Sequence, residues 1–203
     1  MQRFTTLVLA TRNKGKIAEM QRLLDNSELK ITVRSAEEFD LEDVEETGST
    51  FEENASLKAV TIARATGLPA LADDSGLCVD ALDGAPGILS ARWSGVHGND
   101  EANIDRLLEQ LSEIPQDRRS ARFVCVISLA LPDGTTQIVR GELPGSIRFE
   151  RAGRNGFGYD PIFQPEGERQ TLAEMSPEKK DEISHRGRAL RDIAPRILPF
   201  LGL

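Results

Sequence analysis

The sequence predicts a fold of the α/β or α+β class built on one mixed β-sheet, and two observations support this prediction. In the first part of the chain, short apolar runs typical of strands alternate with segments of helical spacing. Further on, two strand-like runs at residues 122–131 and 135–143 are joined by Pro132-Asp133-Gly134, which is a hairpin signal. Because a hairpin is antiparallel, we expect the sheet to be mixed.

The predicted elements follow one another without a linker or an internal repeat, so we expect one domain over residues 1–203. Thr50 can cap a helix that Gly67 ends, with Glu53 completing a capping box. Ser176-Pro177 opens a helix near the end of the chain, and Ser184 opens the last one. Besides the hairpin, we expect strands at residues 5–10, 29–35, 70–72 and 78–82, and helices at residues 14–25, 51–66 and 100–111.

The charge balance argues against a role in binding polyanions. The 203 residues include 25 Lys and Arg against 33 Asp and Glu, which gives a net charge of −8. Such a chain repels nucleic acid unless its basic residues gather in one place. The polar start and the lack of a run of about 20 apolar residues indicate neither a signal peptide nor a membrane helix. We therefore expect a cytoplasmic protein that binds neither nucleic acid nor membrane.

A basic loop lies between the first predicted strand and the first predicted helix: Thr11-Arg12-Asn13-Lys14-Gly15-Lys16. Backbone N–H groups at a helix N-terminus, together with lysines, are suited to binding phosphate. The loop is not a Walker A motif, because Ala10 stands where that motif needs Gly and Ile17 where it needs Ser or Thr. On spacing alone, a phosphate loop and an ordinary solvated loop both remain open.

Two adjacent carboxylates come directly after the strand expected at residues 70–72, in the stretch Asp73-Asp74-Ser75-Gly76. Neighbouring carboxylates repel one another, and the pKa of one rises unless a cation neutralises the pair. Mg²⁺ is the natural cation, because it prefers oxygen ligands and is usually shared between one or two carboxylates and substrate phosphates. The same residues are common in turns, so a structural turn also remains open.

Two further features could complete such a site. The loop at residues 42–48 holds four acids in five positions, of which Glu45 and Glu46 are best placed to reach a metal. A solvated acidic loop is the usual explanation of such a run. Lys58 falls on the apolar stripe of the second predicted helix, so its amine must extend to the surface or meet a partner such as a phosphate.

Near the C-terminus, the segment Gly156-Phe157-Gly158-Tyr159-Asp160 combines glycines, which permit close backbone approach, with two aromatic rings that could stack on a base. Hairpin turns use the same residue types. Basic side chains then gather around the last predicted helices: Lys179, Lys180, His185, Arg186 and Arg188. A solvated helix face and an anion site at a helix start both explain this cluster.

Taken together, these motifs resemble those of the inosine triphosphate pyrophosphatase family, also called XTP/dITP diphosphatase. The resemblance spans nearly the whole chain and is carried by residues 7–16, 45–55, 72–77, 84–87, 90–92, 156–163 and 183–186. It implies an α/β fold in which a long mixed β-sheet is flanked by helices, with two lobes and the nucleotide in a cleft between them. It also implies a homodimer, Mg²⁺ as cofactor and a small-molecule nucleotide as substrate.

The resemblance assigns roles residue by residue. The catalytic acid falls on Asp74, and metal ligation falls on Glu45 and Asp74, with Asp73 beside them. The family's Thr-x-Asn-x-x-Lys phosphate loop falls on Thr11, Asn13 and Lys16, inside a substrate-binding stretch that also includes Arg12, Lys14 and Gly15. Further substrate-binding positions fall on Lys58, Ser75, Phe157, Gly158, Tyr159, Asp160, Lys180, His185 and Arg186. The chain departs from many relatives at Arg12, where a small residue is frequent, and at Leu89, where an aromatic residue is frequent.

The resemblance thus implies hydrolysis of ITP, dITP and XTP to the monophosphate and pyrophosphate, which removes deaminated purines from the nucleotide pool. Asp74 would orient or deprotonate the water that attacks the α-phosphorus, assisted by Mg²⁺. His185 and Arg186 are the candidates for telling a 6-keto purine from a 6-amino purine. Two alternatives remain open: a regulator that senses a purine triphosphate without cleaving it, and a pyrophosphatase of modified pyrimidine nucleotides.

Overall fold

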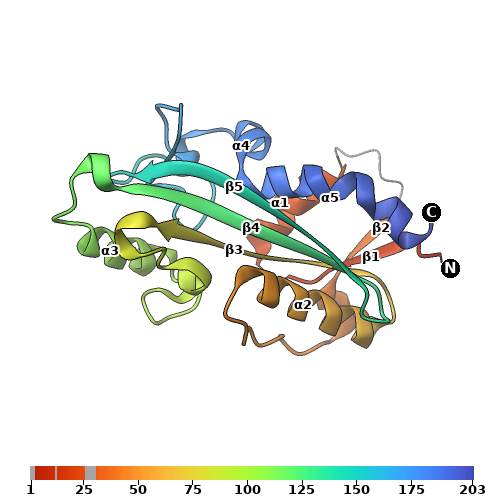
Figure 1. Ribbon diagram of the computed structural model, residues 1–203. Helices are drawn as coiled ribbons and strands as arrows, with labels where there is room; N and C mark the ends of the chain where they lie inside the picture. The colour runs from red at the N-terminus through yellow and green to blue at the C-terminus, as the bar shows by residue number, and fades with distance from the viewer. Residues whose placement is uncertain (1–2, 12, 26–30) are drawn as a thin grey trace. The chain divides into compact units, whose positions relative to one another are not determined.

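Figure 1 shows the computed structural model, which describes residues 3–11, 13–25 and 31–203. Within these residues, six strands form one sheet in the order β2-β1-β3-β4-β5-β6. The strands are β1 (Thr6–Leu9), β2 (Thr32–Ser35), β3 (Ala70–Val79), β4 (Ser120–Ala130), β5 (Thr136–Ile147) and β6 (Phe163–Pro165). The helices are α1 (Lys14–Asp25), α2 (Phe51–Thr66), α3 (Asp100–Gln110), α4 (Pro177–Ile183) and α5 (His185–Leu201).

The sheet is mixed, as the sequence predicts. Strand β1 pairs in parallel with both β2 and β3, so that Val8 lies opposite Arg34 on one side and Ala70 on the other. Strands β5 and β6 are antiparallel. The predicted hairpin is formed by β4 and β5, and the Leu131 N–H closes its turn by donating to the Thr135 carbonyl at 2.9 Å.

One strand prediction is wrong. The sequence predicts two short strands at residues 70–72 and 78–82, whereas the structure has a single strand, β3, from Ala70 to Val79. Asp73 and Asp74 therefore lie inside a strand, and the alternative of a structural turn is excluded. The polar residues interrupt the apolar pattern, but cationic partners from other segments neutralise them, so the strand continues. Residues 80–82 form a 3₁₀ turn instead.

Helix α2 has the predicted limits. The Thr50 side chain accepts a hydrogen bond from the Glu53 N–H at 3.1 Å, and Gly67 ends the helix with a φ of 67°. The predicted capping box is shifted by one residue, because the Glu53 carboxylate accepts the N–H of Ser49 at 2.7 Å. A cap of this kind contributes about 1 kcal/mol. Across the described part of the chain, no helix is both long enough and apolar enough to cross a membrane.

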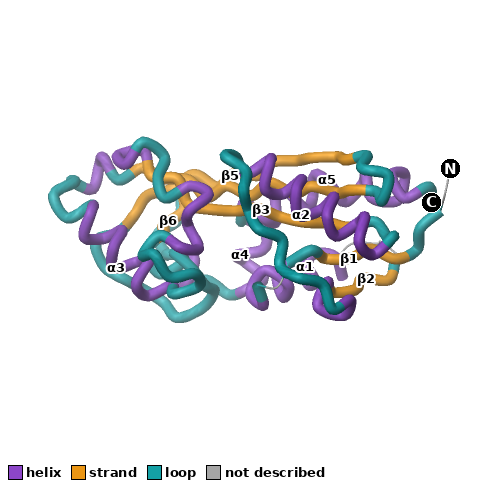
Figure 2. The backbone as a smooth tube through the Cα atoms, turned by 90° about the horizontal axis from the view of Figure 1, so that it is seen from below, coloured by secondary structure: helices purple, strands orange, loops and turns teal. Residues whose placement is uncertain are grey.

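The chain divides into two compact units, and the first comprises Met1–Asp74, Cys125–Gly141 and Arg186–Leu203. Its strands are covered on both faces (Figure 1): α1 and α5 lie on one side of β1, and α2 lies on the other. Leu7, Leu9 and Leu71 pack with α1 and α5, whereas Val8, Ala70 and Ala72 pack with α2. Successive strand residues thus alternate between two apolar layers, as the pleat of a strand requires. Figure 2 shows α2 running along these strands.

The second unit comprises Ser75–Val124 and Glu142–His185. Its core joins the remainder of β3, β4 and β5 with α3 and with the segment around β6. The buried members include Leu77, Ile104, Leu107, Phe123, Leu143, Ile162 and Phe163. Because β3, β4 and β5 each begin in one unit and end in the other, the backbone passes between the units several times.

Candidate functional site

A group of charged and polar side chains surrounds Asp73 and Asp74 in the first unit, and we call it the β3 acid cluster. Its members come from the start of α1, the acidic loop, α2, β3 and the start of α5. They are Lys16, Glu19, Glu46, Asn54, Lys58, Asp73, Asp74 and Arg186. The structure therefore brings together Lys16, Lys58, Asp74 and Arg186, which the sequence marks separately as candidates.

Asp73 is fully enclosed by basic partners. Its Oδ2 lies 2.9 Å from Lys16 Nζ and 3.3 Å from Arg186 Nη2. The Arg186 guanidinium also pairs with Glu19, and both of these side chains are buried. Burial acts to raise the pKa of Asp73, but Lys16, Arg186 and Lys58 outweigh it and hold that pKa far below its usual range. Asp73 is therefore ionised and serves as the counter-ion of Lys16 and Arg186.

Asp74 has a different environment, although it is the next residue. Its Oδ2 accepts a hydrogen bond from Asn54 Nδ2 at 3.1 Å, and its Oδ1 lies 3.6 Å from Lys58 Nζ. Lys58 is held more closely by Glu46, at 2.5 Å. Burial raises the pKa of Asp74 and Glu46 raises it further, while the opposing effect of Lys58 is insufficient to reverse the shift. Asp74 is thus the member of the pair that is poised to accept a proton.

The opposite pKa shifts distinguish the two carboxylates chemically. Titratable neighbours whose pKa values are pushed apart are typical of acid–base sites, because one partner stays charged while the other exchanges a proton near neutral pH. Lys58 keeps its proton, because Asp74, Asp73 and Glu46 raise its pKa despite its burial. Its amine contacts the carboxylates of Glu46 and Asp74, and its contact with a phosphate stays a prediction.

The basic loop at the start of α1 is organised by its own side chains. Asn13 Oδ1 accepts the N–H of Lys16 at 3.1 Å, so Asn13 caps the helix, and Thr11 Oγ1 accepts the N–H of Asn13 at 3.3 Å. Lys14 and Gly15 form the first turn, where backbone N–H groups favour an anion. Arg12 lies outside the described residues. The loop thus directs Lys16 to Asp73 from the N-terminal end of a helix.

The acidic loop presents its two central glutamates differently. Glu45 is exposed, whereas Glu46 is half-buried and contacts Lys58. Among the residues that the structure describes, no group of three or more His, Cys, Asp or Glu side chains is arranged to hold a metal. Two carboxylates suffice for Mg²⁺ when substrate phosphates complete its coordination. Glu46 and Asp74, held on either side of the Lys58 ammonium, are donors that fit a small divalent cation.

A second group of predicted site residues lies together in the other unit. Asp160 Oδ2 accepts hydrogen bonds from Lys180 Nζ at 2.6 Å and from the Phe157 N–H at 2.9 Å. The Lys180 ammonium lies 4.7 Å from the centroid of the Phe157 ring. The Gly158 N–H donates to Asp100 Oδ2 at 2.7 Å. The segment at residues 156–160 is therefore held by two carboxylates and is not a free turn.

The remaining predicted residues of this unit are more enclosed than expected. The Tyr159 ring belongs to the core and its hydroxyl donates to the Ser90 carbonyl at 2.9 Å, which leaves Phe157 as the more accessible ring. Burial raises the pKa of Tyr159. His185 is buried, with its ring stacked on Phe123 at 4.8 Å between centroids. Ser75 is half-buried on β3.

Sequence reasoning missed three residues that the structure places in these groups. Glu19 follows Lys16 by one helical turn, and Asn54 precedes Lys58 by one, so helical spacing could have drawn attention to both. Asp100 opens α3, where an acidic residue is expected for the helix dipole, and no sequence signal points to Gly158.

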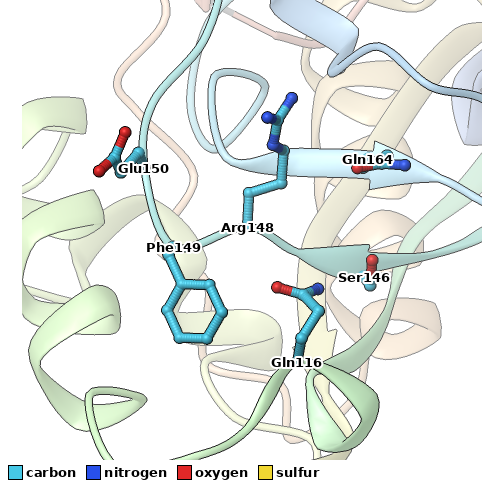
Figure 3. Close-up of a pocket in the computed structure, with 6 residues that line it drawn as sticks. All are labelled: Gln116, Ser146, Arg148, Phe149, Glu150 and Gln164. Carbon is cyan, nitrogen blue, oxygen red and sulfur yellow. The ribbon is translucent and has the colours of Figure 1, made fainter.

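A separate hollow of about 490 Å³ lies in the second unit (Figure 3). It is lined by Gln116, Ser146, Arg148, Phe149, Glu150 and Gln164. Phe149 is 54% exposed, and its ring lies 3.8 Å from the Arg119 guanidinium carbon. None of the predicted site residues is in this lining; they form two separate groups, the β3 acid cluster in the first unit and the group around residues 156–160 in the second.

The mixed sheet and the β3 acid cluster define an α/β protein that keeps two carboxylates with divergent pKa values beside lysines. Such a group of side chains is suited to acid–base chemistry on an anionic ligand. The chain belongs to the Ham1 family, whose model matches residues 7–196.

Relatives and solved structures agree with this assignment. A dITP/XTP pyrophosphatase from Streptomyces avermitilis is 57% identical over 199 residues, covering 98% of this chain and 100% of its own. Another from Streptomyces coelicolor is 55% identical, with the same coverage. The structure of a HAM1 protein from Coxiella burnetii superposes with a TM-score of 0.86 at 45% identity, covering 97% of this chain and 98% of that one. The family resemblance and the α/β fold are thereby confirmed.

We predict that Asp73→Asn destabilises the protein near pH 7 by about 3 kcal/mol, because half-buried Lys16 and buried Arg186 lose the carboxylate that they share. The pKa of Asp73 is lower in the folded state, so its contribution is complete above the ordinary Asp pKa of about 3.9 and is lost progressively as pH falls from there toward the lowered pKa of the folded state. Urea unfolding at several pH values measures the difference. The exposed pair of Asp192 and Arg196 supplies the control, since Asp192→Asn should cost at most about 1 kcal/mol. A loss that persists unchanged at pH 3 would contradict this role.

Proposed function

We propose that the protein hydrolyses non-standard purine nucleoside triphosphates, ITP, dITP and XTP, to the nucleoside monophosphate and pyrophosphate. The pair of adjacent buried carboxylates on β3, with Lys16 and Arg186 at Asp73 and with Asn54 and Lys58 at Asp74, is the observation that carries this proposal. Full-length relatives named dITP/XTP pyrophosphatase, with up to 57% identity, support the choice of substrate. The chain is accordingly a hydrolase of phosphoric anhydride bonds that removes deaminated purines from the nucleotide pool.

Asp74 is the general base in this proposal. Asn54 holds one of its oxygens at 3.1 Å, and the other lies 3.6 Å from the Lys58 ammonium. Asp74 takes a proton from the water as that water attacks the α-phosphorus, and pyrophosphate leaves. Asp73 does not share this role, because its basic neighbours keep it ionised with a depressed pKa.

Lys16 and Lys58 stabilise the negative charge that develops on the leaving pyrophosphate. Phosphoryl transfer is catalysed mostly by positioning and electrostatic stabilisation, so ammonium groups on fixed helices are well suited to it. Lys16 stands at the N-terminus of α1, where the helix dipole adds to its charge. The substrate-binding stretch from Thr11 to Lys16 holds the phosphates through its backbone N–H groups.

We further propose that Asp74 and a glutamate of the acidic loop hold Mg²⁺ together with the substrate phosphates. The resemblance assigns this role to Glu45, whereas the contact with Lys58 and the effect on the pKa of Asp74 favour Glu46. Bound there, the cation supplies charge neutralisation and polarises the phosphoryl oxygens. Lys58 already lies between the two carboxylates, which shows that positive charge is accommodated at this place.

For the base and sugar, we propose the group made by Phe157, Gly158, Asp160, Lys180 and His185. The Phe157 ring offers a face for stacking, and Lys180 is kept beside it by Asp160. Arg186 is engaged with Glu19 and Asp73, so we assign it to support of the β3 acid cluster and leave discrimination of the 6-keto group to His185 and backbone groups. A site built on hydrogen bonds rejects an analogue that cannot form them by about 10⁴-fold.

The remaining expectations stand as proposals. The net charge of −8 favours a small nucleotide over nucleic acid as the partner. We propose that the chain acts as one domain, in the cytoplasm and as a homodimer; the last of these follows from the family resemblance.

Turnover tests the proposed function. Purified protein is incubated with ITP, XTP, dITP, GTP, ATP and dTTP in the presence of Mg²⁺, and release of pyrophosphate is measured, with EDTA as a control. We expect rapid release from ITP, XTP and dITP, slow release from ATP, and none with EDTA. Binding of ITP without release would place the protein among nucleotide sensors, and preference for dTTP would favour a pyrimidine substrate.

We predict that Asp74→Asn lowers kcat by about 10²- to 10⁴-fold with little change in KM, because a general base acts on the transition state more than on substrate binding. Steady-state kinetics with ITP measure both constants. Asp80, an exposed carboxylate paired with Arg122 beyond the end of β3, provides the control: Asp80→Asn should keep both constants. Near-normal kcat in Asp74→Asn would remove Asp74 from the chemical step.

The two glutamates of the acidic loop can be distinguished by how their substitution changes the Mg²⁺ concentration that activity requires. We predict that Glu46→Gln raises the half-saturating Mg²⁺ concentration by about tenfold or more, whereas Glu45→Gln changes it less, because Glu46 is the one in contact with Lys58. Initial rates with ITP across a Mg²⁺ titration measure this concentration. A larger effect in Glu45→Gln would assign the ligand to Glu45.

A further inference from the structure

Asn54 forms two hydrogen bonds, and the function above uses only the one to Asp74. Its side chain is fully buried, with 0% exposed. Oδ1 accepts the N–H of Gly48 at 2.8 Å, at the end of the acidic loop. Nδ2 donates to Asp74 Oδ2 at 3.1 Å, on β3. One side chain on α2 therefore links the two segments that carry the proposed cation ligands.

Helix α2 does not need this side chain for its own structure. Thr50 and Glu53 already satisfy the first turn, and other buried residues of α2, such as Ala55 and Ala59, are apolar. A buried amide is costly unless it is hydrogen-bonded, so an apolar residue would be the simpler occupant of this place. The two partners of the amide, the Gly48 N–H and the Asp74 carboxylate, explain why Asn54 stands here.

We propose that Asn54 is a positioning residue that sets the acidic loop and the Asp74 carboxylate in register, so that both can hold one divalent cation. The inference rests on the proposed function, because it assigns those carboxylates to a cation. With Oδ2 held by Asn54, the Asp74 carboxylate turns Oδ1 to the side where Lys58 and Glu46 lie. Asn54 touches neither substrate nor cation and acts through its two partners.

Gly48 is the residue of the acidic loop that donates its N–H to Asn54 Oδ1. A Cβ at this position would lie 2.6 Å from Asn54 Oδ1 and 2.7 Å from the Glu53 Cβ, which is closer than atoms can approach. Glycine is therefore required here for the close approach of the loop to Asn54. Gly48→Ala must displace the amide or the loop, and should reproduce the effect of losing Asn54 while the amide itself is still present.

The chain offers a matched control in Asn103 on α3. This asparagine is also buried, at 2% exposed, and its Oδ1 also accepts a loop N–H, that of Ser94, at 2.7 Å. Its Nδ2 donates to the backbone carbonyl of Ala91 at 3.3 Å instead of to a carboxylate. Asn103→Ala thus removes a comparable buried amide without touching the acidic loop or β3.

The experiment measures Mn²⁺ binding to the full chain without nucleotide, by electron paramagnetic resonance, for the unsubstituted protein, Asn54→Ala, Gly48→Ala and Asn103→Ala. Mn²⁺ is the probe because oxygen ligands that suit Mg²⁺ also suit Mn²⁺. We expect Asn54→Ala and Gly48→Ala each to weaken binding by about 10- to 100-fold, the usual effect of losing a hydrogen bond to a ligating carboxylate. Asn103→Ala should bind Mn²⁺ as the unsubstituted protein does, even though its Tm falls.

Two outcomes would overturn the role of Asn54: Mn²⁺ binding by Asn54→Ala at the unsubstituted affinity, or equal weakening in Asn103→Ala, which would indicate general loosening. If Asn54→Ala does not fold, Gly48→Ala decides alone, and unchanged binding there overturns the proposal. Failure of the unsubstituted protein to bind Mn²⁺ would show that the two carboxylates do not hold a cation in the absence of nucleotide, and would overturn the role of Asn54. Pyrophosphate release measured on the same samples separates that case from failure of the proposed function.

Discussion

The burial of two adjacent carboxylates in the interior of β3 is the constraint on which the rest of the structure depends. Removing charges from water costs several kcal/mol per ion unless partners with good geometry compensate. The first unit meets this requirement with Lys16 and Arg186 at Asp73, and with Asn54 and Lys58 at Asp74. These partners belong to α1, α5 and α2. The burial of both carboxylates is therefore compensated only when these three helices, which are distant in sequence, pack on the sheet.

The compensation is unequal, and the inequality is what makes the pair chemically useful. Asp73 lies beside two basic side chains, those of Lys16 and Arg186, which lower its pKa and keep it ionised. Asp74 lies beside the Asn54 amide and the ammonium of Lys58, and its pKa is raised. Lys58 is shared because Glu46 competes for it. Arg186, which the sequence suggests as a base-reading residue, also takes part in this compensation, since its guanidinium pairs with Glu19 and Asp73.

The second unit uses carboxylates in another way, to hold backbone. Asp160 accepts the Phe157 N–H as well as Lys180, and Asp100 accepts the Gly158 N–H, so a glycine-rich segment is held by side chains on two sides. Gly156 must lack a side chain, because a Cβ there would lie 2.0 Å from Asp160 Oδ2. The segment whose glycines the sequence marks for close backbone approach is thus held by side-chain hydrogen bonds, which suits a segment proposed to present an aromatic ring to a base.

Local patterns were sufficient to predict α1, α2, α3 and the β4–β5 hairpin, because helical spacing, caps and turn residues act between near neighbours in sequence. Motif resemblance marked most of the β3 acid cluster, including Asp74, Lys16 and Lys58. Only the tertiary structure decided that β3 continues through Asp73 and Asp74 as one strand, that Arg186 faces Glu19, and that Asn54 joins the acidic loop to Asp74. The physical reason is the same for all three: each depends on a charge or a hydrogen bond supplied by a segment far away in the chain, and sequence spacing carries no information about which distant segment will be close enough to supply it.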